Sequence, residues 1–92
     1  MNEALISSIL NEVKGECNIP SSYSDVVLTT FIKEGHFDIT SKVNDLIDFD
    51  SDHSARALLK AFVRYSYYGQ RDLFRQRYDS EYLDLQIRYI NV

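Results

Sequence analysis

The sequence predicts an all-α fold, a small bundle of about four amphipathic helices at approximately residues 3–17, 22–45, 52–68 and 71–90. In each segment, apolar residues recur every three or four positions, which is the spacing of one helical face. Residues typical of helix ends separate the segments. One Pro and three Gly in 92 residues leave little room for a flexible linker, so we expect residues 1–92 to form a single helical domain.

The first helix has a continuous apolar face and ends before the proline. This face consists of Leu5, Ile6, Ile9, Leu10, Val13 and Cys17. Glu12 and Glu16 share another side of the helix, and the run Asn18-Ile19-Pro20 ends it. Because Cys17 belongs to the apolar face, we interpret it as a small core residue and not as a reactive thiol.

The second helix is expected to begin near Ser22, because Ser22 and Asp25 have the spacing of a capping box. Its inward face consists of Leu28, Phe31, Ile32, Gly35, Ile39 and Val43. Gly35 costs about 1 kcal/mol relative to Ala in a helix interior. Either the helix bends at Gly35, or a neighbouring backbone packs against the gap left by the missing side chain. His36 has no metal-like ligand pattern beside it, and we interpret it as solvated or hydrogen-bonded.

An acidic segment connects the second helix to the third. Asp48, Asp50 and Asp52 have the spacing of the first three ligands of a calcium loop. The loop motif also requires a Gly and a Glu, and these positions are occupied by His53 and Leu59. We therefore expect a polar loop without a metal.

The third helix is expected to be capped by Ser51 or Asp52, with Phe49 filling the core from the preceding loop. Successive i, i+4 steps give this helix a basic ridge, made of Arg56, Lys60 and Arg64. The ridge is either a solvated face or a set of partners for acids elsewhere, namely Glu12, Glu16, Glu34 or Asp38. Gly69 suits the left-handed residue that closes a helix, although a helix that continues through it also fits.

The fourth helix is apolar on two sides. One stripe consists of Phe74, Tyr78, Tyr82, Leu85 and Tyr89, and a separate strip consists of Leu83, Ile87 and Ile90. Two apolar sides at the end of a small chain indicate that one of them awaits a partner. The many Tyr and Arg residues of this half are of the types favoured in interfaces. Three i, i+4 ion pairs are predicted along the helix, Arg75–Asp79, Arg77–Glu81 and Asp84–Arg88.

The chain lacks the residue groupings of an enzyme. Two His and one Cys lie in unrelated segments, the three glycines are isolated, and zinc spacing is absent. We expect no catalytic activity, no cofactor and no metal. No apolar run approaches the roughly 20 residues that cross a membrane. The N-terminal residues lack a secretion pattern, and a single Cys suits a reducing cytoplasm.

Charge is distributed unevenly along the chain. Residues 1–50 hold three basic and nine acidic side chains, a net −6, whereas residues 51–92 hold seven basic and five acidic ones, a net +2. These two halves can pair within one fold or between copies of the chain.

With these segments described, the chain resembles the head–tail connector (adaptor or head-completion) proteins of long-tailed bacteriophages over almost its whole length. The N-terminal part matches as Ile9-Leu10-x-x-Val13-Lys14-x-x-Cys17-x-Ile19-Pro20, then Asp25-x-x-Leu28-x-x-x-Ile32-x-x-Gly35-x-x-x-Ile39. The C-terminal part matches as Val63-Arg64-Tyr65, then Phe74-x-x-x-Tyr78-x-x-Glu81-Tyr82-x-x-Leu85-Gln86. Proteins of this family commonly have Ala where this chain has Gly35.

The resemblance implies a virion protein of the head–tail interface, assembled in the host cytoplasm. About a dozen copies would form a closed ring on the portal protein. The ring would extend the DNA channel without sequence-specific binding and receive a stopper or tail-completion protein. We expect portal or neighbour contacts from Arg71, Arg75, Arg77, Tyr78, Tyr82, Ile87, Tyr89 and Ile90. Tyr78 is equally suited to the core.

Two other interpretations remain open. The first is a small helical nucleic-acid-binding or regulatory protein that uses its Arg-rich C-terminal half, in which the third and fourth helices mimic a helix-turn-helix. Asp72, Asp79 and Glu81 on that half, and the negative net charge, oppose this interpretation. The second is a helical oligomer unrelated to phage, which fits the composition and is opposed only by the order of the motifs.

Overall fold

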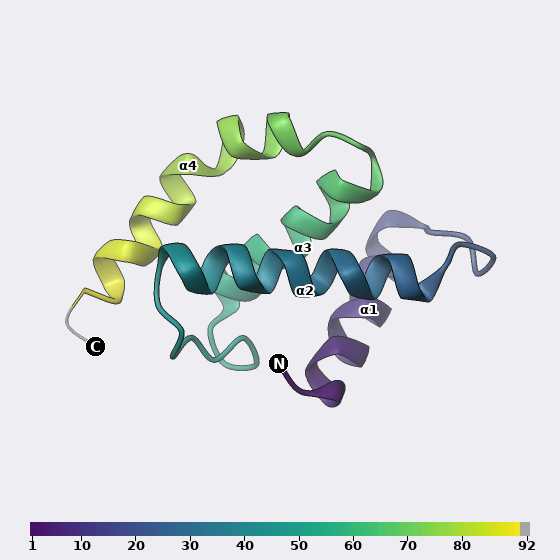
Figure 1. Cartoon of the computed structure of the whole chain (residues 1–92), viewed down its shortest axis with the longest axis horizontal. Coiled ribbons are helices and arrows are strands. Elements are labelled where there is room, and N and C mark those ends of the chain that lie inside the picture. The colour runs from purple at the N-terminus through teal and green to yellow at the C-terminus, as the bar shows by residue number, and fades with distance from the viewer. Residues whose placement is uncertain (91–92) are drawn as a thin grey trace.

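The computed structural model describes residues 1–90, which contain four helices and no strand. The helices are α1 (Glu3–Cys17), α2 (Asp25–Lys42), α3 (His53–Tyr67) and α4 (Arg71–Arg88). In Figure 1, α2 crosses the middle of the molecule in front of α3, with α4 above it and α1 below it. The predicted all-α fold of four helices is confirmed.

Most helix ends follow from capping residues that the sequence identifies. The amide of Ala55 donates to the Asp52 side chain (3.0 Å), so Asp52 is the N-cap of α3 as expected. Asn18, with φ 52°, takes the left-handed conformation that ends α1, and Gly69, with φ 69°, does the same after α3. These ends depend on local chemistry, which explains why the sequence identifies them.

Both ends of α2 differ from the prediction. Its N-cap is Ser24, whose side chain accepts from the Val27 amide (3.3 Å), and not Ser22. Ser22 lies inside a turn that the Tyr23 amide closes onto the Pro20 carbonyl (3.0 Å).

The helix ends at Lys42 and does not reach residue 45. The Asn44 side chain accepts from the Leu46 amide (2.7 Å), a local hydrogen bond that competes with the continuing helix.

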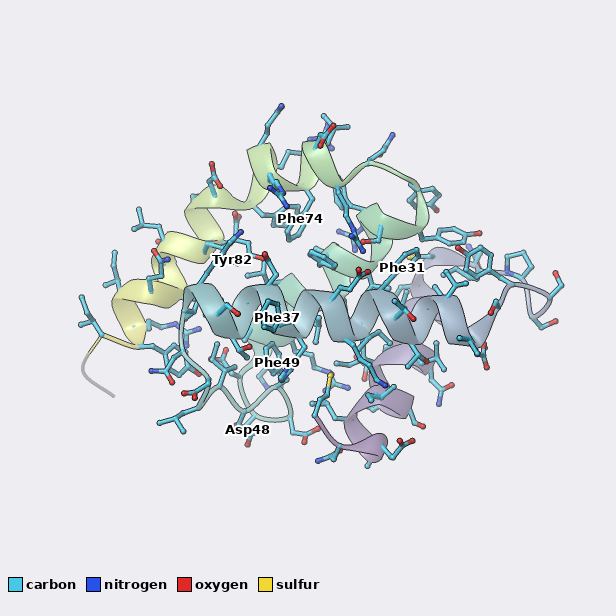
Figure 2. All side chains as sticks on the ribbon, in the orientation of Figure 1. Phe31, Phe37, Asp48, Phe49, Phe74 and Tyr82 are labelled. Carbon is cyan, nitrogen blue, oxygen red and sulfur yellow. The ribbon has the colours of Figure 1, made fainter. Side chains whose placement is uncertain are left out.

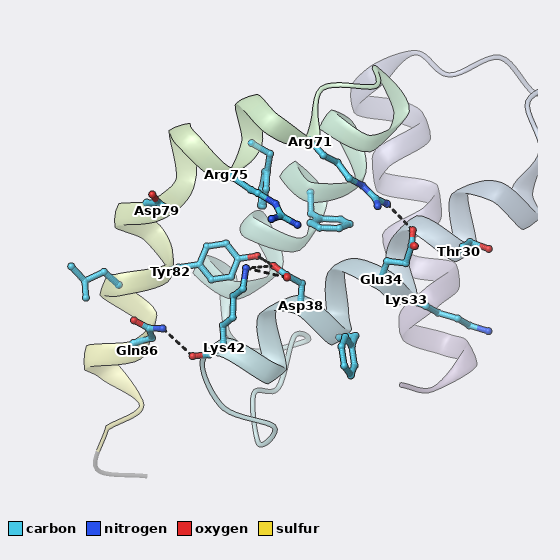
Figure 3. Close-up of a pocket in the computed structure, with 14 residues that line it drawn as sticks. Thr30, Lys33, Glu34, Asp38, Lys42, Arg71, Arg75, Asp79, Tyr82 and Gln86 are labelled. Carbon is cyan, nitrogen blue, oxygen red and sulfur yellow. Dashed lines mark hydrogen bonds and ion pairs between the residues drawn. The ribbon is translucent and has the colours of Figure 1, made fainter.

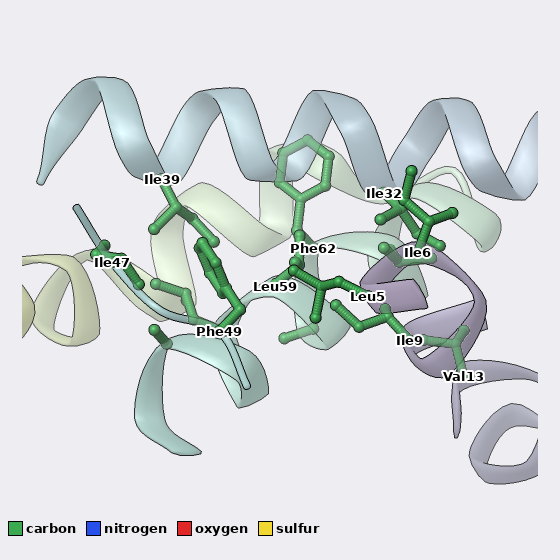
Figure 4. Packing of buried hydrophobic residues seen from close by; sticks show 14 of the residues in the cluster. Leu5, Ile6, Ile9, Val13, Ile32, Ile39, Ile47, Phe49, Leu59 and Phe62 are labelled. Carbon is green, nitrogen blue, oxygen red and sulfur yellow. The ribbon is translucent and has the colours of Figure 1, made fainter. Parts of the chain in front are cut away.

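The core lies between α2, α3 and α1 (Figure 4). Phe49 enters it from the loop before α3 and is 1% exposed, as expected. Phe74 and Tyr82 of α4 point toward α2 from the other side (Figure 2). His36 differs from the prediction: it is half-buried with its ring 5.1 Å from that of Phe49, and burial lowers its pKa. Cys17 packs against the core as expected, and burial raises the pKa of its thiol.

At Gly35, two side chains of α3 lie directly against the backbone of α2. A Cβ at this position would lie 2.7 Å from Cδ1 of Phe62 and 2.8 Å from Cδ1 of Leu59. The gap predicted at Gly35 is therefore filled by two side chains of α3 and not by a neighbouring backbone. Since both side chains are buried in a packed core, neither can move aside cheaply.

We predict that Gly35→Ala destabilises the protein. Ala gains about 1 kcal/mol of helix propensity, but overpacking at this contact costs about 2–3 kcal/mol. The expected net loss is about 1–2 kcal/mol in the free energy of unfolding, measured by urea denaturation.

Gly15→Ala is the matched control. Gly15 is an exposed glycine inside α1, and an added Cβ meets nothing within 4 Å. This variant should gain about 0.5–1 kcal/mol. Equal stabilisation by the two substitutions would contradict the close contact at Gly35.

Candidate partner-binding surface

The acidic and basic halves of the chain meet inside the fold, between α1 and α3. Arg56 donates from Nε to Oε1 of Glu12 (3.1 Å), from Nη2 to the other carboxylate oxygen, and from Nη1 to the Phe49 carbonyl (3.2 Å). Lys60 bridges Glu12 (3.1 Å) and Glu16 (2.8 Å). The first two residues of the predicted basic ridge are thus paired with carboxylates of the same chain. They do not form a free basic surface.

This pairing changes the titration of Glu12. The hydrogen bond from Arg56, reinforced by the one from Lys60, outweighs burial and lowers the pKa of Glu12 from 4.5 to about 2. The carboxylate therefore stabilises the folded state above pH 4.5, and this contribution disappears as the pH falls from 4.5 to 2.

Arg71, an expected partner-binding residue, has an internal role. Its guanidinium donates to Glu34 of α2 (2.6 Å) and to the Ser66 hydroxyl (2.7 Å), and it lies 4.7 Å from the centre of the Phe62 ring. It therefore joins the start of α4 to α2 and α3. A mutation at Arg71 would disturb the fold as well as any surface.

Arg75 and Arg77 differ in their surroundings. Arg77 donates to the Tyr65 hydroxyl (3.0 Å) on the exposed side of α3. Arg75 is exposed and has no carboxylate within 4 Å among residues 1–90. Arg75 is therefore the expected contact residue with the most accessible charge.

Two of the expected tyrosines belong to the interior. Tyr82 is 8% exposed and its hydroxyl donates to Asp38, so its ring is not accessible to a partner. Burial, reinforced by the bond to Asp38, raises its pKa. Tyr78 is half-buried: its ring stacks on Phe74 (5.0 Å), and its hydroxyl accepts from Arg64 (3.2 Å). Both face inward because they share the stripe of α4 that packs against α3.

The C-terminal end of α4 is held by the cap of α3. Tyr89 donates its hydroxyl to Asp52, and Arg88 donates to the same carboxylate (3.2 Å). Burial by itself would raise the pKa of Asp52. The bonds from Tyr89, from the Ala55 amide and from Arg88 outweigh burial and keep the pKa below its usual value.

The three ion pairs predicted along α4 are wrong. None of them occurs within the described part of the chain: Arg75–Asp79, Arg77–Glu81 and Asp84–Arg88. Arg88 bonds Asp52 and not Asp84, because a nearly buried carboxylate is screened less by water than one on the helix surface.

The second apolar strip of α4 faces outward. Leu83, Ile87 and Ile90 are 54%, 60% and 75% exposed. The inward stripe packs α4 on the rest of the fold, and this strip lies outside that packing, with Leu83 at the edge of the groove described below. Single exposed aliphatic residues are ordinary, but three in register on one helix form a patch that favours a partner.

A groove of about 700 Å³ lies between α2 and α4 (Figure 3). Its lining includes the rings of Phe37, Phe62, Phe74 and Tyr82 together with Leu83. Charged side chains also line it: Lys33, Glu34, Asp38, Lys42, Arg71, Arg75 and Asp79.

Three contacts join the two sides of the groove. The Tyr82 hydroxyl donates to Asp38, Arg71 pairs with Glu34, and Gln86 donates to the Lys42 carbonyl (2.9 Å). Several polar groups of the groove are therefore satisfied internally, and Lys33 and Arg75 remain as cations without a carboxylate among residues 1–90.

Sequence reasoning missed the contribution of α2 to this surface. Phe37 is 72% exposed and lines the groove together with Lys33. The signal was present, because Val26, Thr30, Lys33 and Phe37 recur at helical spacing on the face opposite the buried one. The prediction for this helix considered only its inward face.

The groups brought together here suit binding. Among residues 1–90 no three His, Cys, Asp or Glu side chains come close enough to hold a metal ion. In the same range, no helix is both long and apolar enough to span a membrane. The surface consists of the apolar strip of α4, the aromatic groove between α2 and α4, and two groove cations without a carboxylate partner within the described residues, Lys33 and Arg75.

Comparison with known proteins identifies no relative: no family model, no curated protein and no solved structure matches the chain.

We predict that Glu12→Gln lowers the free energy of unfolding by about 1 kcal/mol at pH 7, since about a third of the Glu12 side chain stays exposed and water screens the pair. The variant should also lose less stability than the wild type between pH 4.5 and pH 2. Thermal unfolding across this range measures both effects.

Glu3→Gln serves as the control for this prediction. Glu3 is exposed in the first turn of α1 and pairs with no cation in the described chain. Its substitution should change stability by less than about 0.5 kcal/mol. An acid profile of Glu12→Gln identical to that of the wild type would contradict the proposed contribution of Glu12.

Proposed function

We propose that the chain is a structural subunit of a long-tailed bacteriophage, a head–tail connector that docks on the portal protein. About a dozen copies would form a closed ring, in which unlike surfaces of neighbouring subunits meet. The ring would extend the DNA channel and receive a stopper or tail-completion protein. It belongs to the head–tail interface of the virion after assembly in the host cytoplasm.

The observation that carries this proposal is the outward strip of α4. Leu83, Ile87 and Ile90 are exposed on the last helix, at the end of the chain that the family typically directs toward the portal. Aliphatic residues spaced i, i+4, i+7 are the anchors by which a helix enters a hydrophobic groove. The motif order described above supports the same assignment.

The proposal narrows the set of expected contact residues. Arg75, Ile87 and Ile90 are exposed and suit a portal or neighbour contact. Arg77 stays a secondary candidate beside Tyr65. Arg71, Tyr78, Tyr82 and Tyr89 instead hold α4 in position, and so support the surface without forming it.

The pairing of the basic side chains favours a channel through which DNA passes over a surface that binds DNA. Of the seven basic residues after residue 50, Arg56, Lys60, Arg71 and Arg88 pair with carboxylates. These cations are less available to release counterions from phosphates. The alternative of a nucleic-acid-binding protein that uses its Arg-rich half therefore has less support.

We predict that the wild-type protein co-sediments with purified portal rings and that Ile87→Asp reduces this binding at least tenfold, because a charge on the strip must be desolvated at the contact. Leu46→Asp is the matched control. Leu46 is 69% exposed in the loop after α2 and is not part of the strip, and its substitution should leave binding unchanged.

Far-ultraviolet circular dichroism should confirm that both variants keep the wild-type fold. Failure of the wild-type protein to bind portal rings would overturn the proposal. Salt-dependent binding of the isolated protein to DNA would favour the nucleic-acid alternative.

A further inference from the structure

Contacts that cross the groove between α2 and α4 divide it into short sections. Arg71 pairs with Glu34 (2.6 Å) toward one end of the groove (Figure 3). The Tyr82 hydroxyl donates to Asp38, which lies four residues further along α2. Four residues of an α-helix rise by about 6 Å, whereas a helix with its side chains is about 10 Å wide. The section between these two contacts is therefore too short for a partner helix and suits a compact ligand.

This section has an aromatic floor and a cation without a carboxylate partner. The rings of Phe62 and Phe74 line it and meet edge-on at 5.3 Å. Arg75 extends from α4 toward the same space (Figure 3). Its side chain is exposed and forms no ion pair within residues 1–90. A guanidinium beside aromatic rings offers a ligand one charged contact and one apolar contact.

The charges of the lining favour a ligand with a single negative charge. Two of its cations are in ion pairs with two of its acids. The charges that form no ion pair within the described part of the chain are Lys33, Arg75 and Asp79, a net +1. Lys33 points away from Arg75 in Figure 3, so Arg75 is the cation that a ligand in this section would meet.

We propose that this section of the groove binds a small organic acid, whose carboxylate pairs with Arg75 and whose flat apolar group lies on Phe62 and Phe74. A guanidinium presents parallel N–H donors that match the two oxygens of a carboxylate. An aromatic group on the ligand packs on such rings by offset stacking or edge contacts. The whole groove, at about 700 Å³, has the size of a small-molecule site.

This site is distinct from the apolar strip that the connector proposal assigns to the portal. Ile87 and Ile90 of that strip do not line the groove. Arg75 is the residue that both proposals use. Ligand binding is tested on the isolated full-length protein, without portal rings, so the two proposals can fail separately.

The probes are naphthylacetate and its neutral analogue naphthylacetamide, which have the same shape and differ in charge. Backbone amide shifts in NMR spectra of the full-length protein measure their binding. The acid should bind with a Kd of about 1 mM or tighter. It should shift amides of α2 and α4 beside the groove. The neutral analogue should bind at least about threefold more weakly, because it lacks the charge that pairs with Arg75.

Arg75→Gln should weaken binding of the acid by at least about threefold and leave binding of the neutral analogue unchanged. Lys33→Gln is the matched control, since it removes the same charge from a side chain that points away from Arg75. This variant should weaken the acid by less than about 1.5-fold. Ile87→Asp, the variant designed against portal binding, should bind the acid as the wild type does.

Three outcomes overturn the inference. The first is a wild type without saturable shifts at the groove. The second is equal affinity for the acid and for its neutral analogue. The third is an equal loss of affinity in Arg75→Gln and Lys33→Gln, which would show a general effect of net charge and no contact with Arg75. Each outcome stands whatever the protein does on portal rings.

Discussion

The close approach of α2 to α3 at Gly35 is the constraint on which the rest of the structure depends. With no Cβ at this position, Phe62 and Leu59 enter the surface of α2. The ring of Phe62 then meets Phe74 of α4 edge-on at 5.3 Å, and the Arg71 guanidinium lies over the same ring. The contact at Gly35 therefore helps to position α4 as well, through the ring of Phe62.

The uneven distribution of charge along the chain produces ion pairs that hold the helices together. Arg56 and Lys60 neutralise Glu12 and Glu16 across the α1–α3 contact, and Arg71 joins α4 to Glu34. These pairs join segments far apart in the sequence, so they add to the cohesion of a small core. Lys33 of α2 and Arg75 of α4 form no ion pair within residues 1–90 and stay exposed.

The two sides of the fourth helix differ in their surroundings, since one is buried and the other is exposed. One side inserts Phe74, Tyr82 and Leu85 into the core and is anchored at its end by the bonds of Tyr89 and Arg88 to Asp52. These bonds fix the end of α4 to the start of α3, and the aliphatic residues of the other side share one exposed face. A face held in place before binding loses less entropy on binding than a mobile one, which favours the proposed role of this side in contacting a partner.

The sequence by itself determined the number and type of the helices, the caps at Asp52 and Gly69, and the burial of Phe49. These properties depend on periodicity and on hydrogen bonds between near neighbours, both of which are local. The tertiary structure decided which stripe of α4 faces inward and which partner each charged side chain takes. Arg88 bonds Asp52 and not Asp84, and Tyr82 bonds Asp38, because only the packing of the helices brings such distant residues together and shields them from water.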